Sequence, residues 1–279
     1  MQNIQKFDQK EIVELLFSTN QATFPEVLPE NAEDVSIEVE NEITLACRFF
    51  YSDDKAPNIL YFPAAVDTPD SFGQRAEMFH KFGMNVFFVT YRGQGKSHGA
   101  PAYSSLLQDG VTLVPRVKQF LAGKNCSGSL FVMGRSIGSI VAVETISQKN
   151  DDFKGMIIES GICSTPSYVS ALGANIEQLG ILEEDGFDML SKVEGITLPT
   201  LIFHGATDPF IPVVQAERIQ SYSGARSKQF FIIPGGTHDN LAKIGGDLYF
   251  QTIKQFTDTI CGVNTWRKRR KKQKSAGKE

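Results

Sequence analysis

Short apolar runs alternate with helix-like segments from about residue 55 to residue 260. The runs are largely apolar along their whole length rather than at every second residue, which is typical of strands buried on both faces of a parallel sheet. They are Asn58–Phe62, Asn85–Tyr91, Ser129–Met133, Gly155–Glu159, Thr200–Phe203 and Gln229–Ile233. We therefore predict an α/β fold with a mostly parallel central sheet and helices on both of its faces.

Five segments between and after these runs place apolar residues at helical spacing and predict the covering helices. They are Ser71–Phe82, Ser104–Leu121, Ile137–Gln148, Pro212–Tyr222 and Asp247–Ile260. Pro115 lies inside the second segment. It predicts a kink or a restart there, because proline cannot donate the helical hydrogen bond.

The N-terminal part of the chain departs from this alternation. Residues 35–40 and 43–51 alternate apolar and polar side chains on either side of a possible tight turn, which predicts an antiparallel hairpin at one edge of the sheet. Before it, Asp8–Phe17 has one apolar face and few basic residues, so we predict a helix packed on the domain rather than a membrane anchor. Residues 1–34 are expected to form a helical extension, and residues 35–264 the main domain.

A second departure lies at residues 162–198, where apolar residues are frequent but no strand pattern occurs. Acidic residues are mixed among them. The segment is too short for a separate domain, so we predict a small helical lid over one end of the sheet.

The segment Gly134-Arg135-Ser136-Ile137-Gly138 directly joins a predicted strand to a predicted helix. This G-x-S-x-G spacing is that of a nucleophile elbow, a sharp turn that exposes the serine hydroxyl above the sheet. Glycines on either side leave room for neighbouring backbone, and the helix N-terminus favours negative charge near the serine. The pattern predicts Ser136 as a nucleophile.

A serine hydroxyl is a weak nucleophile and requires a base. Of the four histidines, only His238 lies in a loop just past a late strand, where active-site groups collect in open α/β sheets. We expect structural roles for the others: a surface side chain for His80, a loop hydrogen bond for His98 and a packed residue for His204.

The base in turn requires a carboxylate that orients it. Asp208 follows the strand at residues 200–203 in a turn-rich loop and is the first candidate. Asp before Pro is also a common turn former, and Glu159, at the end of an earlier strand, is the rival acid. Because Ser136, Asp208 and His238 each follow a predicted strand, we predict that these three form a catalytic triad.

Over about residues 35–260 the chain resembles the α/β-hydrolase superfamily of serine hydrolases. The resemblance rests on the elbow, on the order serine, aspartate, histidine, and on the sequence YRGQGKSHGAP at residues 91–101, which is similar to the RGxGxSxG loop of that superfamily. The motifs are most similar to the single-domain, depalmitoylase-like and monoacylglycerol-lipase-like branches. The resemblance implies Ser136 as nucleophile, Asp208 as orienting acid and His238 as general base.

One segment departs from the pattern of the family. Its members usually carry a His-Gly pair after the first central strand, whereas this chain has Phe62-Pro63-Ala64-Ala65. By position, the backbone N–H of Ala65 matches the first oxyanion donor and that of Ile137 the second. Neither donor requires a particular side chain, so we expect an oxyanion hole built on an altered loop.

The composition, 279 residues with 41% hydrophobic and 22% charged residues, is that of a soluble globular domain. No run of 18 apolar residues predicts a transmembrane helix, and the N-terminus lacks the apolar region of a signal peptide. The four cysteines are far apart and fit neither a disulfide framework nor a metal knuckle, and no phosphate-loop motif occurs. We expect a cytoplasmic protein without metal or cofactor.

Charge is divided unevenly along the chain. Residues 265–279 hold eight basic residues and one acidic residue, a net charge of +7, while the rest carries 20 basic and 31 acidic residues, a net charge of −11. The acidic body makes nucleic acid an unlikely partner. We expect the tail to be disordered; attraction to an anionic membrane surface and a nuclear-localisation or nucleic-acid patch are the alternatives.

These features predict a serine hydrolase that cleaves small-molecule carboxylic esters or thioesters through an acyl-enzyme. The apolar residues of the lid favour a medium or long acyl chain. Two alternatives remain open: a small peptidase or amidase with the same triad, and a catalytically weak binding protein of the same fold, which the altered loop at residues 62–65 suggests.

Overall fold

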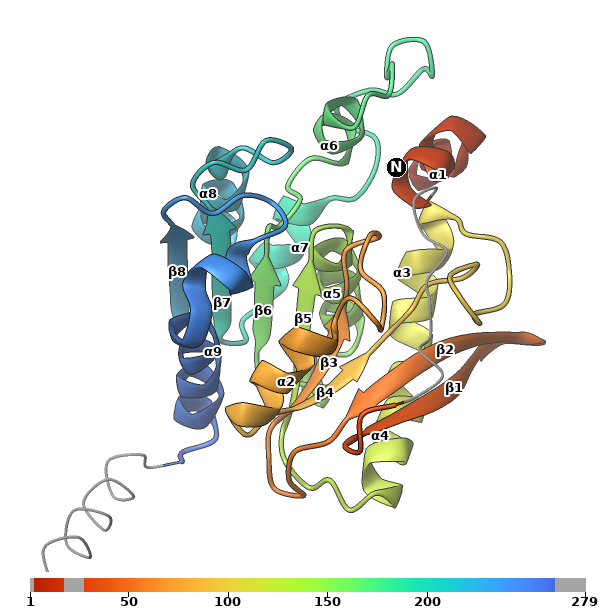
Figure 1. Cartoon of the computed structure of the whole chain (residues 1–279). Coiled ribbons are helices and arrows are strands. Elements are labelled where there is room, and N and C mark those ends of the chain that lie inside the picture. Colours follow the sequence, from red (N-terminus) through yellow and green to blue (C-terminus); the bar gives the residue numbers. More distant parts are fainter. Residues whose placement is uncertain (1–2, 18–27, 264–279) are drawn as a thin grey trace, which may run out of the picture.

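The computed structural model describes residues 3–17 and 28–263 and shows an eight-stranded sheet covered by helices on both faces (Figure 1). The strand order is β1-β2-β4-β3-β5-β6-β7-β8. From β4 to β8 all neighbours are parallel, whereas β1 and β2 pair antiparallel and β2 runs antiparallel to β4. This confirms the predicted mostly parallel α/β sheet with an antiparallel hairpin at one edge.

Each predicted strand is present, with small differences at the ends. The strands are β1 (Ala32–Glu40), β2 (Ile43–Phe50), β3 (Asn58–Phe62), β4 (Asn85–Phe88), β5 (Leu130–Arg135), β6 (Met156–Glu159), β7 (Thr200–Gly205) and β8 (Lys228–Ile233). Strand β1 begins three residues earlier than predicted, because Ala32 still pairs with Phe50 and Asp34 accepts a hydrogen bond from Arg48 across the hairpin.

The helices also follow the predicted order. They are α1 (Lys10–Phe17), α2 (Gly73–Lys81), α3 (Tyr103–Thr112), α4 (Val114–Gly123), α5 (Ile137–Gln148), α6 (Thr165–Ala171), α7 (Met189–Gly195), α8 (Val213–Tyr222) and α9 (Leu241–Ile260), with short 3-10 helices at Ile4–Asp8 and Asn150–Asp152. Helix α4 restarts beside Pro115, as predicted. Helix α9 begins six residues before the predicted start and is interrupted at Gly246, whose backbone is not helical.

Two hydrophobic cores lie on opposite faces of the sheet. On one face, residues of α3, α4, α5, α7 and α8 pack together; on the other, residues of α2 and α9 do so. Successive residues of one strand alternate between the two: Val132 of β5 belongs to the first core, and Phe131 and Met133 belong to the second. Burial on both sides is the reason why the strands from β3 to β7 are largely apolar. The prediction of burial on both faces was wrong for β8, because this strand lies at the edge of the sheet and its Phe231 and Ile232 are exposed.

The segment predicted as a lid contains two short helices, α6 and α7, joined by turns. The N-terminal segment holds it on the body: Lys6 donates to the carboxylate of Asp185 and to the carbonyl of Gly180, and Gln9 donates to the carbonyl of Leu179. Asp8 accepts two hydrogen bonds from Ser104 at the start of α3. The N-terminal helix thus packs on the domain.

The structure does not test the predictions about the basic tail and the domain boundaries. The basic tail at residues 265–279 lies outside the described residues. The proposed boundaries of extension, domain and lid stay predictions. Within the described parts of the chain, none of the helices is long and apolar enough to cross a membrane.

Candidate active site

Ser136 occupies the sharp turn between β5 and α5. Its backbone has φ 53° and ψ −122°, a conformation that residues with a Cβ rarely adopt. The flanking glycines are required by contact: a Cβ on Gly134 would lie 2.2 Å from the carbonyl oxygen of Gly138, and one on Gly138 would lie 2.0 Å from that of Phe62. The structure therefore gives the spacing of this motif a steric reason, the one expected of a nucleophile elbow.

Three loops bring Ser136, Asp208 and His238 together, although they are distant in the sequence. His238, in the loop after β8, has Nε2 2.8 Å from the Oγ of Ser136. Its Nδ1 lies 2.8 Å from Oδ2 of Asp208, in the loop after β7. All three are buried, with exposed fractions of 1% for Ser136, 5% for His238 and 9% for Asp208. The predicted triad residues form one hydrogen-bonded chain.

The charge state of Asp208 fixes the direction of these bonds. Burial acts to raise the pKa of Asp208, but the hydrogen bond and charge of His238, with backbone donors at Phe210 and Ile211, outweigh it and lower that pKa. An ionised carboxylate can only accept hydrogen bonds, so Nδ1 of His238 carries the ring proton and donates a hydrogen bond to Asp208. In the neutral ring Nε2 is then the acceptor for the Ser136 hydroxyl.

The other candidate residues do not belong to this hydrogen-bonded chain. His204 is fully buried and bonds through Nε2 to the carbonyl of Ile211 at 2.8 Å, a packed residue beneath the Asp208 loop as predicted. His80 and His98 are exposed and bond to nearby groups. Glu159, the rival acid, accepts hydrogen bonds from Arg75 and Tyr249 and belongs to a separate ionic cluster.

The loop after β3 is held beside the elbow, although it lacks the His-Gly pair. Tyr91 donates to the carbonyl of Pro63 at 2.7 Å, and Gln94 donates to that of Ala65 at 3.0 Å, so the YRGQG segment supports this loop. The N–H of Ala64 donates to Asp67. Ala65 is buried within the loop, and Ile137 begins α5 directly after the serine. Their role as oxyanion donors stays a prediction.

Tyr168 of α6 is a site residue that the sequence analysis did not single out. Its hydroxyl lies 3.2 Å from the Oγ of Ser136, and its ring lies against that of His238 with 6.3 Å between centroids. Since the one proton of Ser136 is directed to His238, Tyr168 is the donor to the serine oxygen. No sequence signal marks this tyrosine, because it appears only as one apolar residue among many in the lid segment.

No metal site was found in the part of the chain that the structure describes, where no three His, Cys, Asp or Glu side chains gather with suitable geometry. The groups around Ser136 have an arrangement that could support acyl transfer: a hydroxyl bonded to an imidazole, a carboxylate bonded to that imidazole, and backbone groups at a helix N-terminus.

Comparison with known proteins shows what this chain is similar to. The model of the family described as serine aminopeptidase, S33, matches residues 58–183. Protein bem46 of Schizosaccharomyces pombe is 28% identical over 236 residues, which are 80% of this chain and 76% of that protein.

Two solved structures show the same fold. The esterase Pf2001 of Pyrococcus furiosus superposes with a TM-score of 0.67 at 15% identity, covering 86% of this chain and 97% of that chain. A monoacylglycerol lipase of Paleococcus ferrophilus superposes with a TM-score of 0.59 at 16% identity, covering 77% and 99%.

Proposed function

We propose that this chain, a member of the α/β-hydrolase superfamily, is a serine hydrolase that cleaves carboxylic esters or thioesters through an acyl-enzyme. The observation that carries the proposal is the hydrogen-bonded chain from Ser136 through His238 to Asp208, with 2.8 Å at each step. This geometry lets the base take the serine proton while the carboxylate stabilises the resulting imidazolium.

The reaction follows from these contacts. His238 Nε2 accepts the proton of Ser136 as Oγ attacks the acyl carbonyl carbon, and the protonated ring then gives that proton to the departing alcohol or thiol. A water molecule, deprotonated by the same nitrogen, attacks the acyl-enzyme and releases the carboxylic acid. In both steps the backbone N–H groups of Ala65 and Ile137 are proposed to bind the oxyanion of the tetrahedral intermediate.

An acyl substrate of medium or long chain is the substrate class we favour. Tyr168 places α6 directly over the serine, and neighbouring side chains of this segment, such as Ile181 and Phe187, are buried and apolar. Solved relatives in fold include an esterase and a monoacylglycerol lipase. The net charge of −11 outside the tail favours neutral acyl groups over anionic polymers.

The test is a series of p-nitrophenyl esters from C2 to C16, with wild type and Ser136→Ala compared at the same concentration. We expect activity in the wild type, highest at intermediate or long chains, and its loss in the variant. Equal activity of both proteins would exclude the serine mechanism. Failure of the wild type to react with a fluorophosphonate probe would instead favour a binding protein with this fold.

The match to the serine aminopeptidase model supports a second candidate, a small peptidase or amidase with the same triad. Aminoacyl p-nitroanilides tested beside the esters separate the two. A higher kcat/KM for the anilides than for every ester would favour the peptidase.

A further inference from the structure

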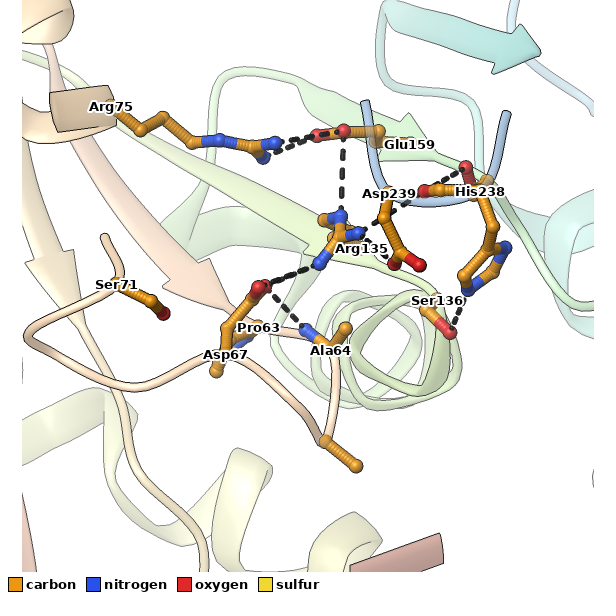
Figure 2. Close-up of polar contacts among 12 residues, drawn as sticks. Pro63, Ala64, Asp67, Ser71, Arg75, Arg135, Ser136, Glu159, His238 and Asp239 are labelled. Carbon is orange, nitrogen blue, oxygen red and sulfur yellow. Dashed lines mark hydrogen bonds and ion pairs between the residues drawn. The ribbon is translucent and has the colours of Figure 1, made fainter. Parts of the chain in front are cut away.

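Arg135 is a buried arginine that the proposed chemistry does not use. It directly precedes Ser136 and is 2% exposed. Side chains alternate along a strand, so its guanidinium points away from the serine hydroxyl into a group of acidic side chains (Figure 2). A buried charge is costly unless several partners offset the loss of water. The position of these partners therefore indicates what the arginine is for.

The guanidinium contacts two loops that border the active site. Nη1 donates to both carboxylate oxygens of Asp67, at 2.7 Å each, in the loop after β3. Nη2 donates to the main-chain carbonyl of His238 at 3.1 Å and to the carboxylate of Asp239 at 2.7 Å, in the loop after β8. Nε forms an ion pair with Glu159 at 3.5 Å. Figure 2 shows Arg135 between these groups.

The partners of Arg135 in turn shape the site. Oδ2 of Asp67 accepts the N–H of Ala64 at 3.1 Å, which fixes the backbone immediately before Ala65. On the other side, the carbonyl that Arg135 holds is that of His238 itself. One planar group thus connects the loop proposed to bind the oxyanion with the loop that carries the base.

The chemistry of arginine suits this task. A guanidinium presents five N–H donors in fixed directions, whereas a lysine offers one compact charge. The acidic side chains of the cluster have a second positive partner, since Nη1 of Arg75 forms an ion pair with Oε2 of Glu159 at 2.8 Å. Burial acts to lower the pKa of Arg135, but Asp67 and Glu159 outweigh it and keep the group protonated. Only Asp239 in this cluster is well exposed.

We propose that Arg135 is a positioning residue that sets the loop at residues 63–67, through Asp67, and the His238 loop relative to Ser136. The inference rests on the proposed serine hydrolase function. It explains how a loop without the usual His-Gly pair keeps its shape: the Ala64 N–H is bound by a carboxylate that Arg135 itself holds in place. Misplacing an oxyanion donor or a base lowers the rate of the chemical step more than it weakens substrate binding.

The test compares Asp67→Asn with Asp34→Asn. Each variant removes the charge of an aspartate that pairs with a buried arginine, but Asp34 pairs with Arg48 in the β1–β2 hairpin, away from Ser136 in the strand order. We expect kcat of Asp67→Asn on the best p-nitrophenyl ester to fall about 10- to 100-fold with KM changed less than about 3-fold. The affinity of the variant for a trifluoromethyl ketone, which binds as a hemiketal oxyanion, should fall by the same factor. Asp34→Asn should stay within about 2-fold of wild type.

Arg135→Lys and the double variant Arg135→Lys/Asp67→Asn extend the test. If the arginine acts through Asp67, the double variant is no slower than Arg135→Lys alone; fully additive losses would overturn the proposal. Hydrogen exchange supplies a readout independent of activity. We expect faster exchange in peptides spanning residues 62–70 and 234–242 for Arg135→Lys, and in the first alone for Asp67→Asn. Unchanged exchange in both loops would also overturn it.

The outcomes separate this inference from the proposed function. A wild type no more active than Ser136→Ala contradicts the serine hydrolase, while hydrogen exchange still decides whether Arg135 holds the two loops. An active wild type with Asp67→Asn equal to Asp34→Asn leaves the serine mechanism standing and overturns the positioning role.

Discussion

The hydroxyl of Tyr168 lies 3.2 Å from the hydroxyl oxygen of Ser136, on a helix that belongs to the segment between β6 and β7. The serine therefore has two polar neighbours, His238 from the loop after β8 and Tyr168 from α6. This relationship joins the segment predicted as a lid to the proposed chemistry by a direct contact, and it leads to the first prediction.

Tyr168→Phe is expected to lower kcat/KM on a p-nitrophenyl ester about 5- to 10-fold, because the serine oxygen loses a donor worth about 1 kcal/mol. Tyr103→Phe is the matched control, since Tyr103 is likewise a buried tyrosine and its hydroxyl bonds Thr165, at the start of the same helix, rather than Ser136. Measured kcat/KM should fall in the first variant and stay close to wild type in the second. Equal values for the two would assign Tyr168 a packing role only.

Asp208→Asn and Glu159→Gln distinguish the two candidate acids. Asp208→Asn removes the acceptor for His238 Nδ1 and should reduce kcat about 10³- to 10⁴-fold with little change in folding. Glu159→Gln removes the charge that faces Arg75 and should cost about 3–5 kcal/mol of stability with a smaller loss of kcat. Steady-state kinetics and urea unfolding measure both effects. A larger kcat loss in Glu159→Gln would contradict the assignment.

Gly138→Ala is expected to destabilise the fold by more than about 2 kcal/mol and to lower activity, because the new methyl group would meet the Phe62 carbonyl. Gly195→Ala is the control: it is also a helical glycine, but no atom lies within 4 Å of the added Cβ. That change should be neutral or stabilising by up to about 1 kcal/mol. Thermal unfolding of both variants decides, and a Gly138→Ala melting temperature equal to that of wild type would refute the steric reason for the motif.

His204 should make stability depend on pH. Burial lowers its pKa below the ordinary histidine value of about 6.5, so near that pH the unfolded chain binds a proton that the folded chain does not. Protonation of this residue therefore leaves the free energy of unfolding unchanged well above about pH 6.5. As the pH falls below about 6.5, it lowers the free energy of unfolding by at most about 1.4 kcal/mol per pH unit. Urea unfolding from pH 7.5 to 5.5 should show a shallower decrease for His204→Gln than for wild type. Parallel curves would contradict this.

The basic tail leads to a prediction about location. If it attracts the protein to anionic lipid, full-length protein should co-sediment with vesicles containing phosphatidylserine at low salt, at about 1 kcal/mol per basic residue near the surface. A version that ends at Asn264 should remain in the supernatant, as should the full chain with neutral phosphatidylcholine vesicles. Equal sedimentation of both proteins would exclude the membrane role of the tail.

Much of the fold can be read from local patterns. The largely apolar runs at Asn58–Phe62 and Gly155–Glu159 predict buried parallel strands, because each such strand has a hydrophobic core on both sides. Gly134 likewise marks the elbow through a short-range contact with Gly138, whereas Gly138 leaves room for Phe62, which is distant along the chain. Pro115 marks a helix start. In contrast, the early start of α9 was not predictable, since the interruption at Gly246 hides the periodicity of its first turns.

Some residues of the candidate site can likewise be predicted from the sequence, and others cannot. Ser136, Asp208 and His238 can be named from sequence because each follows a strand within a recognisable motif. Tyr168 and Arg135 cannot, because their neighbours are far away along the chain: Tyr168 meets Ser136 across 32 positions, and Arg135 meets His238 across 103. Before folding, a tyrosine among apolar residues and an arginine in a variable motif position carry no signal for these contacts.

From the amino-acid sequence alone, the elbow and the candidates for nucleophile and base can be predicted, and the acid can be narrowed to Asp208 or Glu159, because these predictions depend on periodicity and on which residues follow a strand. Only the tertiary structure decided which acid faces His238, since Asp208 and Glu159 both end or follow buried strands and differ only in what packs around them. The tertiary structure also brings the Tyr168 hydroxyl to Ser136 and the Arg135 guanidinium to the His238 loop. Such contacts are set by how helices and loops close over the sheet, which no local pattern encodes.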